Sequence, residues 1–218
     1  MTGLELDVRT FTVGPFRENC YIVRRAGASQ ALMIDPGEEA PRLIEAVDAL
    51  GVAIGAILIT HAHIDHIGAV APLARHTGAP VYCPVLERHV LADIDGVYGP
   101  MGLGSFESYE ADHLPAGGEA LELAGLELDV IFTPGHSQGH LTYAIPAYEA
   151  LFGGDVLFRR SVGRVDLPGG DWPTLLASIS TLLDAYPPET VVHPGHGPQT
   201  TLGIERAENP FLSELAAR

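Results

Sequence analysis

The apolar positions along the chain predict strands first, and then helices that alternate with strands. Up to residue 34, apolar and polar residues alternate between turns, which is typical of strands. After Pro41 the apolar residues recur with a helical period as far as Gly51, and a short, wholly apolar run follows that is typical of a buried strand. We expect strands at residues 4–13, 20–24, 31–34 and 54–59.

The rest of the chain continues this mixture of elements. We expect helices over residues 68–77, from Asp171 as the N-cap to Pro187-Pro188, and over residues 205–217. Further strands are predicted at residues 80–83, 120–123, 126–132, 140–145, 150–152 and 190–193. Two groups of strands with helices between them indicate an α/β (α+β) protein, with mixed sheets covered by helices.

One stretch does not follow this regular pattern. Between Ile94 and Leu114 the period is lost, and glycine occurs at positions 96, 99, 102 and 104. We therefore expect residues 96–109 to form a mobile flap rather than an ordered helix or strand.

Composition limits the classes of function. With 218 residues, 46% of them hydrophobic and 18% charged, we expect one folded domain over residues 1–218. The net charge is −16 and all 12 basic residues are arginines, so nucleic acid and anionic membranes are poor partners and no lysine can act as a nucleophile. The chain lacks a signal-peptide pattern and any membrane-spanning apolar run, so we expect a cytoplasmic protein. Cys20 and Cys83 lie in separate strand-like runs and are expected to be buried free thiols.

The strongest chemical signal directly follows the predicted buried strand. The segment Thr60-His61-Ala62-His63-Ile64-Asp65-His66 contains four potential metal ligands within six residues. In an extended segment His61 and His63 point the same way and reach one ion, whereas Asp65 and His66 follow a bend and can reach a second. Imidazole and carboxylate groups are the usual ligands of zinc and its neighbours, so this segment predicts a metal site.

Three further ligands occur singly, each in a glycine turn after an apolar strand. They are His136 in Thr133-Pro134-Gly135-His136, Asp155 in Gly153-Gly154-Asp155 and His196 in Pro194-Gly195-His196-Gly197. Together they supply a third histidine for one metal, a carboxylate able to bridge, and a third ligand for the other metal. The remaining histidines are interpreted differently: His140 and His193 either orient ligands or are structural, and His76, His89 and His113 are expected to have no chemical role.

These residues resemble, in order and spacing, the metallo-β-lactamase superfamily. The resemblance covers nearly the whole chain and implies an αββα sandwich, in which two mixed β-sheets are flanked by helices. It also implies two divalent metal ions, with zinc as the first choice and iron or manganese as alternatives. By matching position, the ligands of the first ion are His61, His63 and His136, those of the second are Asp65, His66 and His196, and Asp155 bridges both.

Finer features resemble the glyoxalase II-like branch, the hydroxyacylglutathione hydrolases. The segments that carry this resemblance are Pro15-Phe16-Arg17-Glu18-Asn19-Cys20-Tyr21, residues 163–171 and Asn209-Pro210-Phe211-Leu212. Longer members of the branch have a helical C-terminal domain that holds glutathione, and short members lack it. We expect this chain to be a short member without that domain, and its substrate to be a thioester, S-lactoylglutathione or a related acyl-thiol.

The resemblance implies attack of a metal-bridging hydroxide on the thioester carbonyl, with Asp65 as a metal ligand that can also accept a proton. A thiol has a pKa of about 8.5, so it leaves as a thiolate without a strong general acid, whereas the nitrogen of a β-lactam requires protonation. Arg164 matches a substrate-binding position of the branch, where a guanidinium can hold a carboxylate. Arg159 and Arg160 are interpreted as solvated loop residues.

Other classes stay open at this point. Persulfide dioxygenases share this fold and much of the motif but use one iron, and a hydrolase of another ester would use the same ligands. A non-catalytic metal-binding protein is less consistent with the full ligand set. The RNA-processing nucleases of the superfamily carry an added domain and a basic surface. The expected partner is a small acyl-thiol, and the chain is either a monomer or a homodimer.

Overall fold

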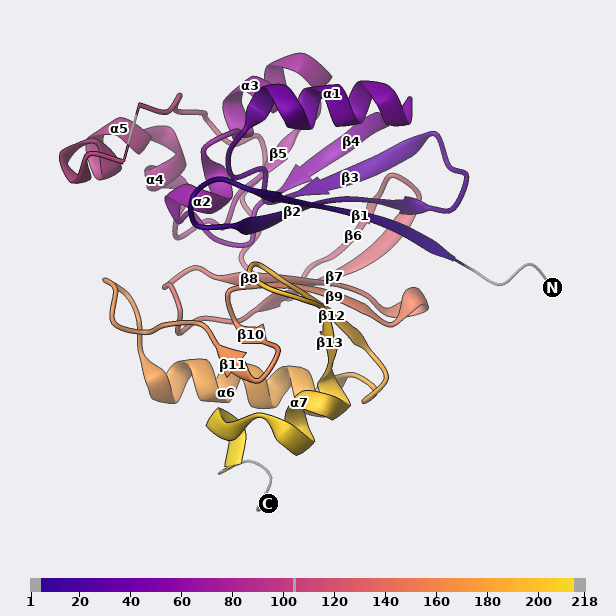
Figure 1. Ribbon diagram of the computed structural model, residues 1–218, viewed down its shortest axis with the longest axis vertical. Coiled ribbons are helices and arrows are strands. Elements are labelled where there is room, and N and C mark those ends of the chain that lie inside the picture. Colours follow the sequence, from indigo (N-terminus) through magenta and orange to yellow (C-terminus); the bar gives the residue numbers. More distant parts are fainter. Residues whose placement is uncertain (1–4, 104, 214–218) are drawn as a thin grey trace. The chain divides into compact units, whose positions relative to one another are not determined.

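The computed structural model describes residues 5–103 and 105–213, and the chain divides into two compact units. Unit 1 consists of Met1–Pro115 with Glu122–Leu126, and unit 2 of Ala116–Leu121 with Glu127–Arg218. A mixed β-sheet with helices forms the main part of each unit (Figure 1). This division does not test the prediction of one domain over residues 1–218, which stays a prediction.

The sheet of unit 1 is antiparallel on one side and parallel on the other. Its order is β1-β2-β3-β4-β5, antiparallel from β1 to β3 and parallel from β3 to β5. The strands are β1 (Leu6–Val13), β2 (Glu18–Arg25), β3 (Gln30–Ile34), β4 (Ala53–Leu58) and β5 (Val81–Tyr82). The helices are α1 (Ala40–Leu50), α2 (Ile64–Ile67), α3 (Val70–Thr77), α4 (Arg88–Ala92), α5 (Ile94–Tyr98) and the 3-10 helix η1 (Gly99–Met101).

Helices α1 and α3 pack against this sheet (Figure 1). Leu43 and Val47 lie one helical turn apart on α1 and are buried in the same apolar cluster as Met33 and Ile57 of the sheet. Gly51 ends α1 in the left-handed conformation, as the sequence pattern predicts. The helix expected from residue 68 begins at Val70, and the short helix α2 precedes it.

The main sheet of unit 2 has the order β13-β12-β9-β8-β7-β6, and β10 pairs with β11 in a separate two-stranded sheet. Strands β9 and β12 are parallel, whereas β7, β8 and β9 are antiparallel to one another in turn. The strands are β6 (Ala120–Leu123), β7 (Leu126–Phe132), β8 (Leu141–Ile145), β9 (Ala150–Gly154), β10 (Leu157–Phe158), β11 (Ser161–Val162), β12 (Val191–Pro194) and β13 (Thr200–Thr201). The helices are η2 (Pro146–Tyr148), α6 (Trp172–Ala185), α7 (Leu202–Glu208) and η3 (Pro210–Leu212).

Helix α6 begins where the sequence predicts. The carboxylate of Asp171 accepts the backbone N–H of Thr174 at 2.9 Å and caps the helix. Leu175, Ile179 and Leu182 then recur at helical spacing and are buried in one apolar cluster of unit 2. The predicted capping residue of this helix is confirmed.

The expectation of irregular structure over residues 96–109 is wrong for residues 96–101, which form the end of α5 and η1. Asp93 caps α5 by accepting the backbone N–H of Gly96 at 3.1 Å, and a Cβ at position 96 would lie 2.2 Å from that carboxylate. This glycine therefore makes room for a helix cap. Gly104 lies outside the described residues, and the mobility of the flap stays a prediction.

The last predicted helix also differs from the structure. Helix α7 spans Leu202–Glu208, whereas the sequence pattern predicts residues 205–217. The helix stops early because Pro210 has no backbone N–H to continue it, and Asn209 caps η3 by accepting the N–H of Phe211 at 3.0 Å. Residues 214–218 lie outside the described part of the chain.

Cys20 and Cys83 are buried free thiols, as predicted, and burial raises the pKa of both, which disfavours the reactive thiolate.

Among the residues that the structure describes, no helix combines the length and the apolar character needed to cross a membrane.

Candidate metal centre

In unit 1 the predicted ligand segment leaves the sheet beside another strand end. Strands β3 and β4 are parallel neighbours, with Ile34 opposite Leu58, and the backbone N–H of Asp35 donates to the carbonyl of Leu58 at 3.0 Å. Asp35 follows β3 and residues 60–66 follow β4. Polar side chains from these two carboxyl ends therefore meet at one edge of the sheet.

The carboxylate of Asp35 orients three groups of this segment. Its Oδ1 accepts the backbone N–H of Thr60 at 2.7 Å, and its Oδ2 accepts the Thr60 hydroxyl at 2.7 Å and Nδ1–H of His66 at 3.0 Å. All three residues are buried. Because His66 donates through Nδ1, its Nε2 carries the lone pair, and that atom lies 4.0 Å from Oδ2 of Asp65.

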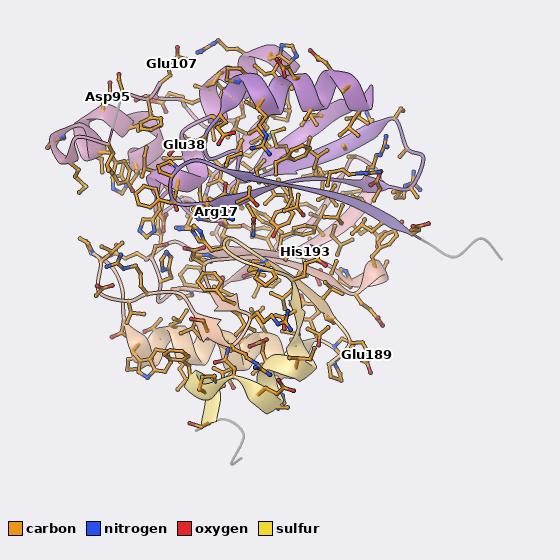
Figure 2. The ribbon with its side chains drawn as sticks, in the orientation of Figure 1. Arg17, Glu38, Asp95, Glu107, Glu189 and His193 are labelled. Atoms are coloured by element: carbon orange, nitrogen blue, oxygen red, sulfur yellow. The ribbon has the colours of Figure 1, made fainter. Side chains whose placement is uncertain are left out.

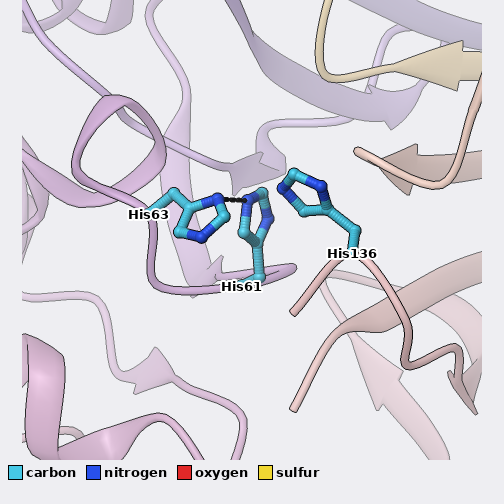
Figure 3. A group of neighbouring side chains, drawn as sticks. All are labelled: His61, His63 and His136. Atoms are coloured by element: carbon cyan, nitrogen blue, oxygen red, sulfur yellow. Dashed lines mark hydrogen bonds between the residues drawn. The ribbon is translucent and has the colours of Figure 1, made fainter. Parts of the chain in front are cut away.

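His61 and His63 present their ring nitrogens to each other. The Thr60 hydroxyl gives its hydrogen to Asp35, so it accepts Nδ1–H of His61 at 3.1 Å. Nε2 of His61 is then the acceptor for Nδ1–H of His63, 3.0 Å away (Figure 3). Two nitrogen ligands of a tetrahedral zinc ion lie about 3.3 Å apart. A cation therefore fits these two nitrogens once the proton between them has left.

In unit 2 two more strand ends lie side by side. Strands β9 and β12 are parallel neighbours, and the N–H of Gly195 donates to the carbonyl of Gly154 at 2.8 Å. Asp155 follows β9, His196 follows β12, and His136 follows β7. Oδ2 of Asp155 lies 3.5 Å from Nε2 of His136 and 3.5 Å from Nε2 of His196. One carboxylate oxygen is thus close to both histidines.

Residues 163–171, one of the segments that carry the family resemblance, contact this group through their backbone. Nδ1–H of His136 donates to the carbonyl of Arg164 at 2.8 Å, which leaves Nε2 with the lone pair on the side of Asp155. At Gly163 a Cβ would lie 1.8 Å from the carbonyl oxygen of Asp155, so no side chain fits there. The backbone of this segment therefore sets the tautomer of His136 and packs against the backbone of Asp155.

The side chain of Arg164, predicted to bind substrate, is held by a neighbouring carboxylate. Its Nε and Nη2 donate to the two oxygens of Asp166 at 2.6 and 2.7 Å. This hydrogen-bonded guanidinium lowers the pKa of Asp166 to about 2. A substrate carboxylate would have to replace Asp166 on the same two N–H groups, and the role of Arg164 stays a prediction.

Two buried carboxylates beside His66 were not predicted. The sequence contains a signal for Asp35, because it follows an apolar strand in the same way as Asp155. In the structure its φ of 49° is a left-handed conformation that a non-glycine residue rarely adopts. Glu18 lies in a segment quoted for the family resemblance, and its Oε1 is 3.9 Å from Nδ1 of His66. Nothing in its local pattern distinguishes Glu18 from an exposed glutamate.

Of the two histidines left open by the sequence, His140 contacts a ligand residue. Its Nε2 accepts the backbone N–H of Asp155 at 3.1 Å, and its Nδ1–H donates to the hydroxyl of Thr133 at 3.0 Å. His140 is fully buried, so it orients the backbone at Asp155. By contrast, His113 stacks on Tyr82 with ring centroids 4.3 Å apart, in a structural contact of unit 1.

Comparison with known proteins identifies the family to which this chain belongs. A sequence profile described as the metallo-β-lactamase superfamily matches residues 13–196. The chain belongs to the metallo-β-lactamase superfamily. A probable metallo-hydrolase of Bacillus subtilis is 39% identical over 94% of this chain and 97% of its own length. The hydroxyacylglutathione hydrolase GloC of Haemophilus influenzae is 32% identical over 95% of this chain and 99% of its own.

Solved structures of the metallo-β-lactamase superfamily confirm the predicted fold class, mixed β-sheets flanked by helices. The crystal structure of the BLEG-1 B3 metallo-β-lactamase has a TM-score of 0.89 and 39% identity, and the match covers 95% of this chain and 100% of that one. The structure of TTHA1623 in a di-iron-bound form has a TM-score of 0.83 and 42% identity, with 94% and 100% covered. Membership of the superfamily supports a metal-dependent hydrolase, and the metal named for the second structure is iron rather than zinc.

His193, the second histidine whose role the sequence does not decide, lies in β12 (Figure 2). Its ring stacks on Phe152 with centroids 4.7 Å apart, and its Nδ1 accepts a hydrogen bond from Gln199 at 3.1 Å. Burial lowers the pKa of His193 from 6.5 to about 4. Between these values the unfolded chain binds a proton that the folded chain does not, so the free energy of unfolding falls as the pH decreases through this window.

We expect His193→Gln, which cannot take up this proton, to lose about 3 kcal/mol less stability than the wild type between neutral pH and pH 4. Urea unfolding of chelator-treated protein at both pH values measures the difference. Equal losses in the two proteins would contradict the depressed pKa.

Proposed function

We propose that the protein is a binuclear metal-dependent hydrolase of thioesters, acting on S-lactoylglutathione or a related acyl-thiol. By resemblance to the superfamily, the ligands of one ion are His61, His63 and His136, those of the second are Asp65, His66 and His196, and Asp155 is shared. The observation that carries the proposal is the equal distance of 3.5 Å from Oδ2 of Asp155 to Nε2 of His136 and of His196, two histidines assigned to different ions. Zinc is the first choice of metal, with iron and manganese as alternatives.

When bound, two divalent ions supply an activated water and polarise the carbonyl of the substrate. The chain's own residues orient the ligands: Asp35 and the carbonyl of Arg164 hold Nδ1 of His66 and His136, so that Nε2 of each ring carries the lone pair. Asp65 is 17% exposed at its side chain, against 10% for Asp155 and 3% for Asp35. It is therefore the carboxylate of these three best placed to accept a proton and pass it to solvent.

The leaving group favours a thioester over a β-lactam. A thiolate departs without protonation at a pH near its pKa of about 8.5, whereas the nitrogen of an opened β-lactam needs a proton. The similarity to a relative named hydroxyacylglutathione hydrolase supports the same choice. A second candidate, β-lactam hydrolysis, is favoured by the similarity to a B3 metallo-β-lactamase.

The first test of this proposal is metal content: the protein, purified without chelator, should contain between one and two equivalents of zinc, iron or manganese. Asp155→Asn should lower kcat/KM by about 100-fold and should also lower the metal content, because it removes one charge near two ligand histidines. His113→Ala is the control, since that ring stacks on Tyr82 instead. Elemental analysis and thioester assays measure both. A fixed single iron, with oxygen consumed in the presence of glutathione persulfide, would indicate a dioxygenase instead.

The second prediction compares substrates on one zinc-loaded sample. We expect kcat/KM for S-lactoylglutathione or a smaller thioester to exceed that for a β-lactam by at least about tenfold, because only the β-lactam nitrogen needs a proton to leave. Thiol release and β-lactam absorbance follow the two reactions. A higher kcat/KM for the β-lactam would reject thioester hydrolysis in favour of the second candidate.

The third prediction tests Arg164 as a substrate anchor. Arg164→Ala should raise KM for a carboxylate-bearing thioester and leave kcat nearly unchanged, as expected when uniform binding is lost. Asp166→Asn is the matched variant: it weakens the ion pair, makes the guanidinium available and should lower KM. A thioester without a carboxylate should respond to neither substitution. If Asp166→Asn raises KM as Arg164→Ala does, the pair is structural and does not bind substrate.

A further inference from the structure

Two side chains outside the predicted ligand set contact the peptide groups between His61 and His63. Glu87 immediately precedes α4, and Tyr98 is the last residue of α5. The backbone N–H of Ala62 donates to Oε2 of Glu87 at 2.5 Å, and the hydroxyl of Tyr98 donates to the carbonyl of Ala62 at 2.9 Å. Residues 25 and 36 positions further along the chain thus bond to the single residue between two candidate ligands.

The two bonds act on consecutive peptide planes. The nitrogen of Ala62 belongs to the peptide that links it to His61, and its carbonyl belongs to the peptide that links it to His63. Because a trans peptide is planar, holding both planes sets φ and ψ of Ala62. The separation and direction of the two histidine side chains follow from those two angles.

These contacts lie in the interior of unit 1. Ala62 is 1% exposed and Glu87 is 7% exposed, so water competes little for either bond. Burial and the charge of Glu87 raise the pKa of Tyr98 to about 12, so the hydroxyl keeps its proton and remains a donor. The bond from Tyr98 to Ala62 is therefore present across the pH range in which the protein would act.

Helix α5 is itself tied to the chain that follows it. Oδ1 of Asp95, which is labelled in Figure 2, accepts the backbone N–H of Phe106 at 3.1 Å. The N–H of Ile94 donates to the hydroxyl of Ser108 at 3.0 Å. Tyr98 thus belongs to a helix that is held by hydrogen bonds to residues 106 and 108.

We propose that Glu87 and Tyr98 are positioning residues that set the geometry of the His61–His63 pair. Through them, residues 87–98 control the affinity of these histidines for a metal ion. The inference rests on the proposed role of His61 and His63 as ligands of one ion. Neither Glu87 nor Tyr98 needs to touch the metal.

The test uses the full chain and zinc alone as the probe. Tyr98→Phe, which removes only a hydroxyl, and Glu87→Ala should each lower zinc affinity about 10-fold or more, measured by competition with a chromophoric chelator. Glu87→Gln keeps an acceptor oxygen and should restore affinity to within about threefold of the wild type. Tyr109→Phe is the matched control, because that hydroxyl interacts with Asp112 rather than with Ala62.

A second measurement is independent of metal. In chelator-treated protein, exchange of the Ala62 amide should be at least about tenfold faster in Glu87→Ala than in the wild type or Glu87→Gln, and the Ala62 carbonyl chemical shift should change in Tyr98→Phe. Unchanged zinc affinity in both Glu87→Ala and Tyr98→Phe overturns the inference, as does a loss in Glu87→Gln equal to that in Glu87→Ala. If Glu87→Ala does not fold, Tyr98→Phe against Tyr109→Phe decides. A wild type that binds no zinc, iron or manganese contradicts the proposed function, whereas altered Ala62 signals would still show the contacts.

Discussion

The ligand segment of unit 1 depends on one buried carboxylate, that of Asp35. It bonds directly to Thr60 and His66, and through the Thr60 hydroxyl it also determines the tautomer of His61. Each buried donor left without an acceptor costs about 1–3 kcal/mol. Without Asp35, the N–H and hydroxyl of Thr60 and Nδ1–H of His66 would all lose their acceptor. The segment would then rearrange to hydrogen-bond with water, and its histidines would lose the orientation needed to bind a metal.

Both units orient their histidines by the same principle, although the chemical groups differ. In each unit two parallel strands end side by side, which brings residues distant in sequence to one edge of the sheet: Asp35 beside Thr60, and Asp155 beside His196. A hydrogen bond to Nδ1 then sets which nitrogen presents its lone pair. In unit 1 the acceptor for His66 is a carboxylate, and in unit 2 the acceptor for His136 is a backbone carbonyl. The second arrangement orients a ring without adding charge.

The sequence predicts those elements that are determined by residues adjacent in the chain. The buried strand β4, the ligand segment after it and the Asp171 cap of α6 need only neighbouring residues to be recognised. The contacts of Glu87 and Tyr98 with Ala62 could not be predicted, because they join positions 25 and 36 residues apart and no local pattern encodes that pairing. The sequence also does not distinguish the role of Gly96, because glycine gives conformational freedom at some positions and allows the close approach of a capping carboxylate at others.

At position 164 the backbone and the side chain have separate contacts. The carbonyl accepts a hydrogen bond from His136, whereas the guanidinium lies at the surface with Asp166. Every amino acid carries that carbonyl, so a mutation at 164 changes the surface group and keeps the histidine's acceptor. Divergence among relatives, or a designed library at positions 164 and 166, can therefore explore new recognition chemistry while the inherited orientation of His136 is conserved.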